Sequence, residues 1–162
     1  MKYIEPTAYN LAESQEIAKQ IEVELAILLG IEQSVQIALQ WMTRDRGNSR
    51  KLSTLRFVAR SFERQLTRTR VLADYGGYMH LITDIKPRLA SEVTALRSAR
   101  AELQANFERI IVRLEYVSPD DAVGFPKVCA ELEHYLTDLK AHGRKELELL
   151  QRSFRQNEGQ AG

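Results

Sequence analysis

Hydrophobic residues recur every three or four positions along most of the 162-residue chain, which is the spacing of one face of an α-helix. Four segments carry such a stripe, and they predict helices at about residues 7–44, 50–74, 87–116 and 127–155. Residues 78–82 are expected to add a short extra helical turn between the second and third helices. The pattern therefore predicts an all-α fold.

Turn-forming residues separate the four stripes: Arg46-Gly47-Asn48-Ser49, then Gly76-Gly77, and then Ser118-Pro119-Asp120-Asp121. Asn48 or Ser49 is the expected cap of the second helix. Amphipathic helices of about 25 to 35 residues with short connections most simply pack as an antiparallel up-down-up-down four-helix bundle. The length fits one such domain, 1–162, with a polar tail at 156–162.

The composition indicates in which cellular compartment this bundle is found. One cysteine, Cys129, excludes an internal disulfide, and the first residues lack the apolar run of a secretory signal. Every apolar run is broken by charged or polar residues before it reaches the roughly 18 residues of a membrane span. We therefore expect a soluble, cytoplasmic protein with no membrane association.

Charge is divided between the first two helices. Residues 1–42 carry two basic and six acidic groups, whereas residues 43–71 carry nine and two, although the net charge is only +1. Helices of opposite sign attract one another inside a bundle, so this division does not predict a nucleic-acid partner. The second helix also carries a basic ridge, which we expect acids of the first helix, among them Glu22 and Glu24, to cover in part: Arg56, Arg60, Arg64 and Arg68.

Polar residues that interrupt an apolar stripe mark the candidate site, because bundles build their sites from inward-facing side chains. On the last helix, steps of three or four from Leu139 reach His142 and then Glu146. Imidazole nitrogen and carboxylate oxygen one turn apart suit a metal ion such as iron. Glu32 interrupts the first helix in the same way and is the third candidate ligand.

The corresponding position on the third helix, between Leu96 and Leu103, is Arg100. A guanidinium inside the bundle repels a metal cation and needs an anionic partner to offset its desolvation. We predict that Arg100 pairs with Glu146 or Glu32, in the space that a metal ion would occupy. The alternative, in which the side chain extends outward between helices, stays open at this point.

Three segments resemble the hemerythrin-like (HHE cation-binding) domains, four-helix bundles whose inward His and acidic residues hold a di-iron centre. They are FVARSFERQLTRTRVLADYGGYM at 57–79, PRLASEVTALRSARAEL at 87–103 and LKAHGRKELELLQRSFRQNEG at 139–159. The resemblance implies that His142 and Glu146 match family ligands. It also implies that Arg100 and Gln65 stand where the family has histidines, and that Ala73 with Asp74 replaces its acidic pair.

These departures lead to the functional hypothesis of a hemerythrin-like bundle that has lost its di-iron site and needs no cofactor. It is expected to be a non-catalytic regulatory or interaction module, with a protein partner or a second copy of itself. Tyr78 and Met79 are expected to help cap one end of the core. If Tyr78, Met79 and Leu81 are exposed instead, they form the candidate surface for such a partner. The alternative is a protein that senses or stores iron, oxygen or a redox signal through His142 and Glu146.

Overall fold

The computed structural model describes residues 9–40, 47–74, 82–83 and 86–158, and within them it holds four α-helices and no strand. The prediction of an all-α fold with four long helices is confirmed. The elements are α1 (Tyr9–Gln40), α2 (Gly47–Asp74), a 3-10 turn η1 (Pro87–Leu89), α4 (Ala90–Tyr116) and α5 (Gly124–Glu158). No described helix is long and apolar enough to cross a membrane.

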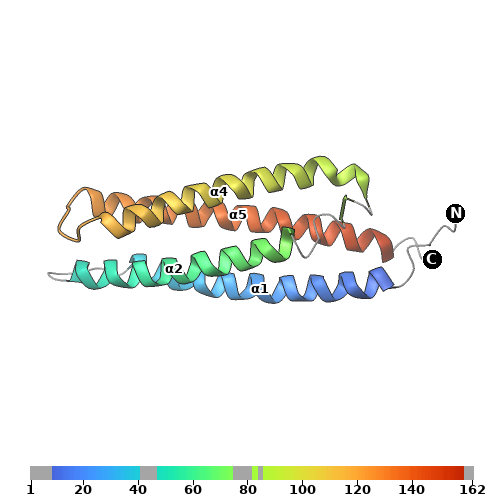
Figure 1. The fold of residues 1–162 in the computed structure, drawn as a ribbon, viewed down its shortest axis with the longest axis horizontal. Helices are drawn as coiled ribbons and strands as arrows, with labels where there is room; N and C mark the ends of the chain where they lie inside the picture. Colours follow the sequence, from blue (N-terminus) through green and yellow to red (C-terminus); the bar gives the residue numbers. More distant parts are fainter. Residues whose placement is uncertain (1–8, 41–46, 75–81, 84–85, 159–162) are drawn as a thin grey trace.

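The four helices lie side by side along the long axis of the molecule (Figure 1). Following the colours, α1 and α4 run toward one end, and α2 and α5 run back. Each long helix packs against the next one in the chain, and α1 also packs against α5. The start of α1 and the end of α5 therefore lie at the same end, opposite the α1–α2 and α4–α5 connections.

Helix boundaries differ from the predictions in two places. The predicted capping role of Asn48 and Ser49 is wrong, because α2 already begins at Gly47. Helix α5 begins before Pro126, which is tolerated in a first turn because the amide there needs no partner within the helix. The predicted turn at 78–82, the Gly76-Gly77 stop and the Tyr78, Met79 and Leu81 cluster lie wholly or mostly outside the described residues.

Asp121 organises the start of α5. Its Oδ1 accepts the amides of Val123 and Gly124 at 3.1 and 2.8 Å, and these two hydrogen bonds lower the pKa of its carboxyl. A Cβ at Gly124 would collide with the Asp121 carboxylate. Glycine is therefore the residue that lets this aspartate approach the first amides of the helix.

The basic ridge of α2 makes contacts that differ from our expectation. Arg56 donates to three backbone carbonyls at the end of α4, those of Leu114, Glu115 and Val117, at 2.6, 3.0 and 3.1 Å. Arg60 pairs with the Glu115 carboxylate. Two of the four arginines therefore satisfy and complement the carboxyl end of α4, where helix carbonyls lack partners. The expected contact with an acid of α1 is made by Arg68, whose Nε lies 3.1 Å from the Glu24 carboxylate.

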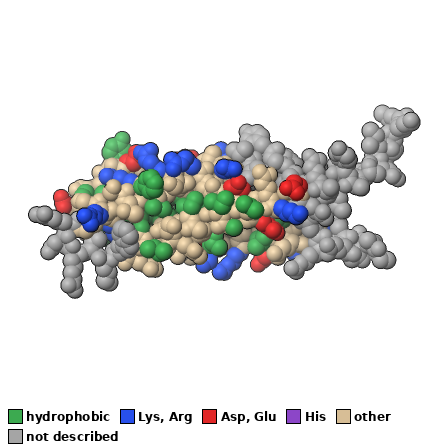
Figure 2. All heavy atoms as spheres, turned by 90° about the horizontal axis from the view of Figure 1, so that it is seen from below, with side chains coloured by type: hydrophobic (Ala, Val, Ile, Leu, Met, Phe, Trp, Pro, Cys, Tyr) green, Lys and Arg blue, Asp and Glu red, His purple; other side chains and the backbone are tan. Residues whose placement is uncertain are grey.

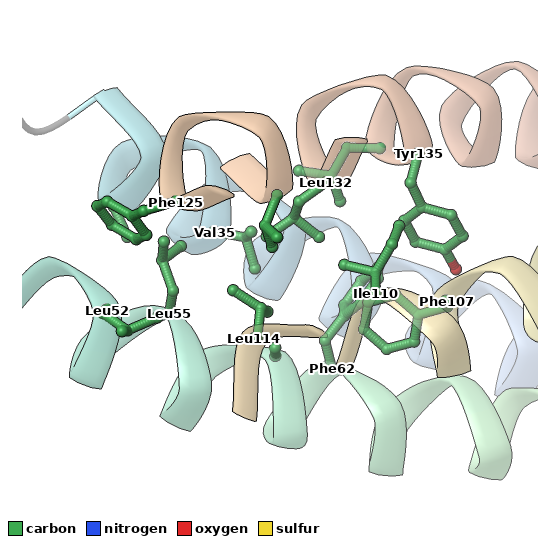
Figure 3. Packing of buried hydrophobic residues seen from close by; sticks show 14 residues of the cluster. Val35, Leu52, Leu55, Phe62, Phe107, Ile110, Leu114, Phe125, Leu132 and Tyr135 are labelled. Carbon is green, nitrogen blue, oxygen red and sulfur yellow. The ribbon is translucent and has the colours of Figure 1, made fainter. Parts of the chain in front are cut away.

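The buried hydrophobic residues form two separate clusters. The larger one surrounds Leu55, Phe62, Leu114 and Leu132 near the α1–α2 and α4–α5 connections, with Phe107 and Tyr135 at its inner end (Figure 3). The smaller one is built near the other end of the bundle from Ile21, Ile82, Leu89, Val93, Leu96, Leu149 and Leu150. Among the described residues, four buried polar side chains fall between the two clusters along the helices, so the middle of the bundle is a polar layer: Glu24, Glu32, His142 and Glu146.

Candidate functional site: a buried ion pair beside an interior pocket

The polar layer contains the four residues that the stripe pattern singled out. Glu32 on α1, and His142 and Glu146 on α5, are 6, 8 and 6% exposed. The Arg100 side chain on α4 is 16% exposed. Glu32, Arg100 and His142 each follow a buried or partly buried leucine by three or four residues. Glu146 precedes the buried Leu149 and Leu150 by three and four residues, so the helical repeat turns all four side chains toward the interior.

Arg100, His142 and Glu146 meet at a single oxygen. Glu146 Oε1 accepts a hydrogen bond from Arg100 Nη2, and it lies 2.8 Å from His142 Nε2. A carboxylate oxygen can only accept, so His142 Nε2 carries the proton and donates it. Of the two orientations that the sequence left open for Arg100, the structure has the inward one, in which the guanidinium contacts Glu146.

The electrostatics of Glu146 follow from these contacts. Burial by itself raises the pKa of a carboxyl, but the hydrogen bonds and positive charge supplied by His142 and Arg100 outweigh it. The net pKa of Glu146 is lowered, so this buried carboxyl stays ionised. The ion pair is therefore a fixed feature of the interior.

Glu32, the other predicted partner of Arg100, stands apart from this group. No hydrogen bond or ion pair joins it to another of the described residues, although the residue is only 6% exposed. Burial raises the pKa of its carboxyl, and the nearby charge of Lys140 opposes this only in part. Of the two acids predicted to partner Arg100, Glu146 is therefore neutralised, whereas Glu32 has no hydrogen bond or ion pair within the described structure.

Glu24 is a third buried acid, which the sequence pattern placed only among the acids that cover the basic ridge and not among the interior residues. It is 5% exposed and accepts Gln65 Nε2 at 2.5 Å and Arg68 Nε at 3.1 Å. The signal was present, because Glu24 lies three residues after Ile21 and four before Leu28, on the inward stripe. Gln65, placed by the resemblance at a family histidine position, instead donates to this acid.

An interior pocket of about 340 Å³ adjoins the ion pair. Side chains from all four long helices line it, including Glu32, Arg100, His142 and Glu146. Much of its wall is apolar: Leu25, Leu28, Leu66, Leu103, Phe107 and Leu139. Exposed residues such as Lys140 and Arg144 also line it, so the pocket reaches solvent between the helices.

The donor set does not fit a di-iron or mononuclear iron centre. His142 and Glu146 are the only two candidate ligands in contact, and the one Glu146 oxygen that faces His142 also binds a guanidinium. Across the described part of the chain, no three His, Cys, Asp or Glu side chains converge as metal ligands would. Glu32 is therefore not brought to His142 and Glu146 as the third ligand that the sequence suggested.

No family model, curated protein or solved structure matches this chain. The hemerythrin-like resemblance therefore stays a hypothesis that depends on the sequence motifs.

The ion pair predicts a non-additive mutational pattern. Arg100→Leu leaves the Glu146 charge buried without its cation, which should lower the free energy of unfolding by roughly 3–5 kcal/mol. The double variant Arg100→Leu/Glu146→Leu should recover most of this loss, because both charges are removed together. Chemical denaturation measures both, with Arg109→Leu, exposed on the same helix, as the control. Equal losses in the single and double variants would contradict the pairing.

The buried carboxyl of Glu32 predicts that the stability of the protein depends on pH. Its folded-state pKa lies above the ordinary value of 4.5, so its contribution to stability is fully present below that pH and lost as pH rises through the folded pKa. Glu32→Gln should therefore be more stable than wild type at pH 7, and the difference should vanish toward pH 4.5. Thermal unfolding across this range, with the exposed Glu102→Gln as control, measures it. A destabilised Glu32→Gln at pH 7 would refute the assignment.

Proposed function

We propose that this chain is a hemerythrin-like four-helix bundle that has lost its di-iron centre and acts as a non-catalytic interaction module. The contact of Arg100 with Glu146 carries this proposal. A guanidinium held against one of only two matched ligands repels a metal cation from that position. Cys129 supports the non-catalytic part, because burial raises the pKa of its thiol and disfavours the nucleophilic thiolate.

Metal analysis tests the loss of the iron centre. Protein purified without a chelator or a polyhistidine tag should contain no stoichiometric iron, because Arg100 occupies the carboxylate. His142→Ala should leave the metal content unchanged, and so should His134→Ala, an exposed histidine on the same helix. Iron at one ion per chain that is lost in His142→Ala alone would establish the alternative, an iron, oxygen or redox sensor that uses His142, Glu146 and Glu32.

The outer face of α1 supports the interaction part of the proposal. Every exposed residue from Val23 to Gln40 is uncharged, because the two acids of this stretch, Glu24 and Glu32, are buried. Val23, Ile27 and Ile37 are 58, 45 and 59% exposed on it. Figure 2 views the molecule from the α1 side and shows a row of hydrophobic side chains along it. An apolar surface free of charge is typical of the centre of a protein interface.

A second copy of this chain is the partner that fits this face. Ala26, Gly30 and Ser34 follow at four-residue spacing, and a Cβ at Gly30 would meet no atom within 4 Å, so another helix can approach the backbone there. The Ser34 hydroxyl is already satisfied, since it donates to the Gly30 carbonyl at 3.1 Å. A charge-free face favours an equally charge-free one, which a two-fold related α1 supplies.

The homodimer gives a direct test. Wild-type protein should show a concentration-dependent dimer by light scattering or sedimentation. Ile27→Glu should weaken it at least about tenfold, because it buries an unpaired charge at the interface. Val112→Glu, the same kind of change at a 53% exposed position on α4, should leave the dimer intact. A monomer at all concentrations, or equal effects of both variants, would contradict the α1 interface.

A further inference from the structure

We infer that the interior pocket binds a small organic cation, a protonated amine with an apolar body, and that the Glu32 carboxylate recognises its ammonium group. This inference rests on the proposed function, because a metal centre at His142 and Glu146 would fill part of the same space.

The size and walls of the pocket suit such a ligand. A volume of about 340 Å³ lies at the lower end of the range of small-molecule sites, roughly 300 to 1,000 Å³. Leucines from α1, α2, α4 and α5 form its aliphatic wall. An alkyl or aromatic body of modest size would replace the water that otherwise contacts these side chains.

Glu32 is the group in this pocket that a cationic ligand would stabilise. The other two buried acids of the polar layer have donors, since Glu146 is bound by Arg100 and His142, and Glu24 by Gln65 and Arg68. Glu32 lines the pocket, is 6% exposed and has no hydrogen-bond donor among the described residues. A buried carboxylate without a donor is costly, and the nearby charge of Lys140 offsets this only in part. A ligand ammonium would supply the missing hydrogen bonds together with further positive charge.

The aromatic end of the pocket adds to this selectivity. Phe107 and Tyr135 line it and stack with their ring centroids 4.8 Å apart. Burial raises the pKa of the Tyr135 hydroxyl, and the negative charge of Glu32 raises it further, so the hydroxyl stays neutral. The Glu32 carboxylate is therefore close enough to Tyr135 to interact with it electrostatically. Aromatic side chains beside a carboxylate form a surface that attracts an ammonium group.

An anionic ligand fits the same pocket less well. Of its basic side chains, Arg100 has its charge offset by the Glu146 carboxylate, whereas Arg70 donates to the neutral amide of Gln104. Lys140 and Arg144 are exposed, so an anion drawn to them would stay near the mouth. The buried end of the pocket therefore presents an acid for recognition, with the arginine of the layer engaged by its own carboxylate.

The test uses hexylamine as the probe, with hexanol and hexanoate as neutral and anionic analogues of the same length. Calorimetric titrations use wild-type protein at neutral pH whose metal content has been measured. They should show saturable binding of hexylamine, a lower affinity for hexanol and the lowest affinity for hexanoate. Glu32→Gln should lose at least about tenfold in hexylamine affinity, because a charge-assisted hydrogen bond becomes a neutral one. Glu108→Gln, an exposed acid lining the same pocket, should bind like wild type.

Glu32→Gln should stay folded at neutral pH, so lost affinity cannot be ascribed to unfolding, and circular dichroism checks this. Unchanged hexylamine affinity in Glu32→Gln, or preference for hexanoate, would overturn the inference. Absence of hexylamine binding in protein that holds no iron would overturn the inference and leave the proposed function standing. Stoichiometric iron in the purified protein would instead overturn the proposed function.

Discussion

The Glu146 carboxylate sets the strictest requirement in this bundle, because it is both buried and ionised. A charge removed from water must be met by hydrogen-bond donors and by an opposite charge. Here they come from two helices: Arg100 on α4 supplies the cation, and His142, one turn earlier on α5, donates a hydrogen bond. This contact fixes the register of α4 against α5 at the middle of the molecule. The leucine stripes on either side alone would tolerate other registers, because apolar packing is not directional.

The same requirement divides the core. Ion pairs and buried acids in the middle layer separate two hydrophobic clusters, one near the helix connections and one near the start of α1 and the end of α5. Side chains around a charged centre cannot close into a continuous hydrophobic core, and a pocket of about 340 Å³ remains beside them. The feature that disfavours a metal ion therefore also leaves room for another ligand.

The outward-facing residues of α1 and α2 differ in their charge and in what they contact. On α2, Arg56 donates to the end of α4, where backbone carbonyls lack partners within the helix, whereas Arg68 pairs with Glu24 of α1. On α1 the exposed surface from Val23 to Gln40 has no charge at all. A helix that is apolar on both sides is expected to be covered on both sides, which links the internal packing of α1 to our proposal that its outer face contacts a second copy.

Periodicity in the sequence was sufficient for the helices and for the inward position of Glu32, His142 and Glu146, because a helix repeats its faces every 3.6 residues regardless of what surrounds it. It placed Arg100 on the same face but left open whether its long side chain points inward or extends outward between helices. It could not choose between Glu146 and Glu32 as the partner of Arg100, since that depends on how α1, α4 and α5 are rotated and shifted against one another. For the same reason it could not place Glu24 with Gln65, direct Arg56 to α4, or reveal the pocket. Spacing along one helix determines which residues share a face, and only packing between helices decides which of them touch.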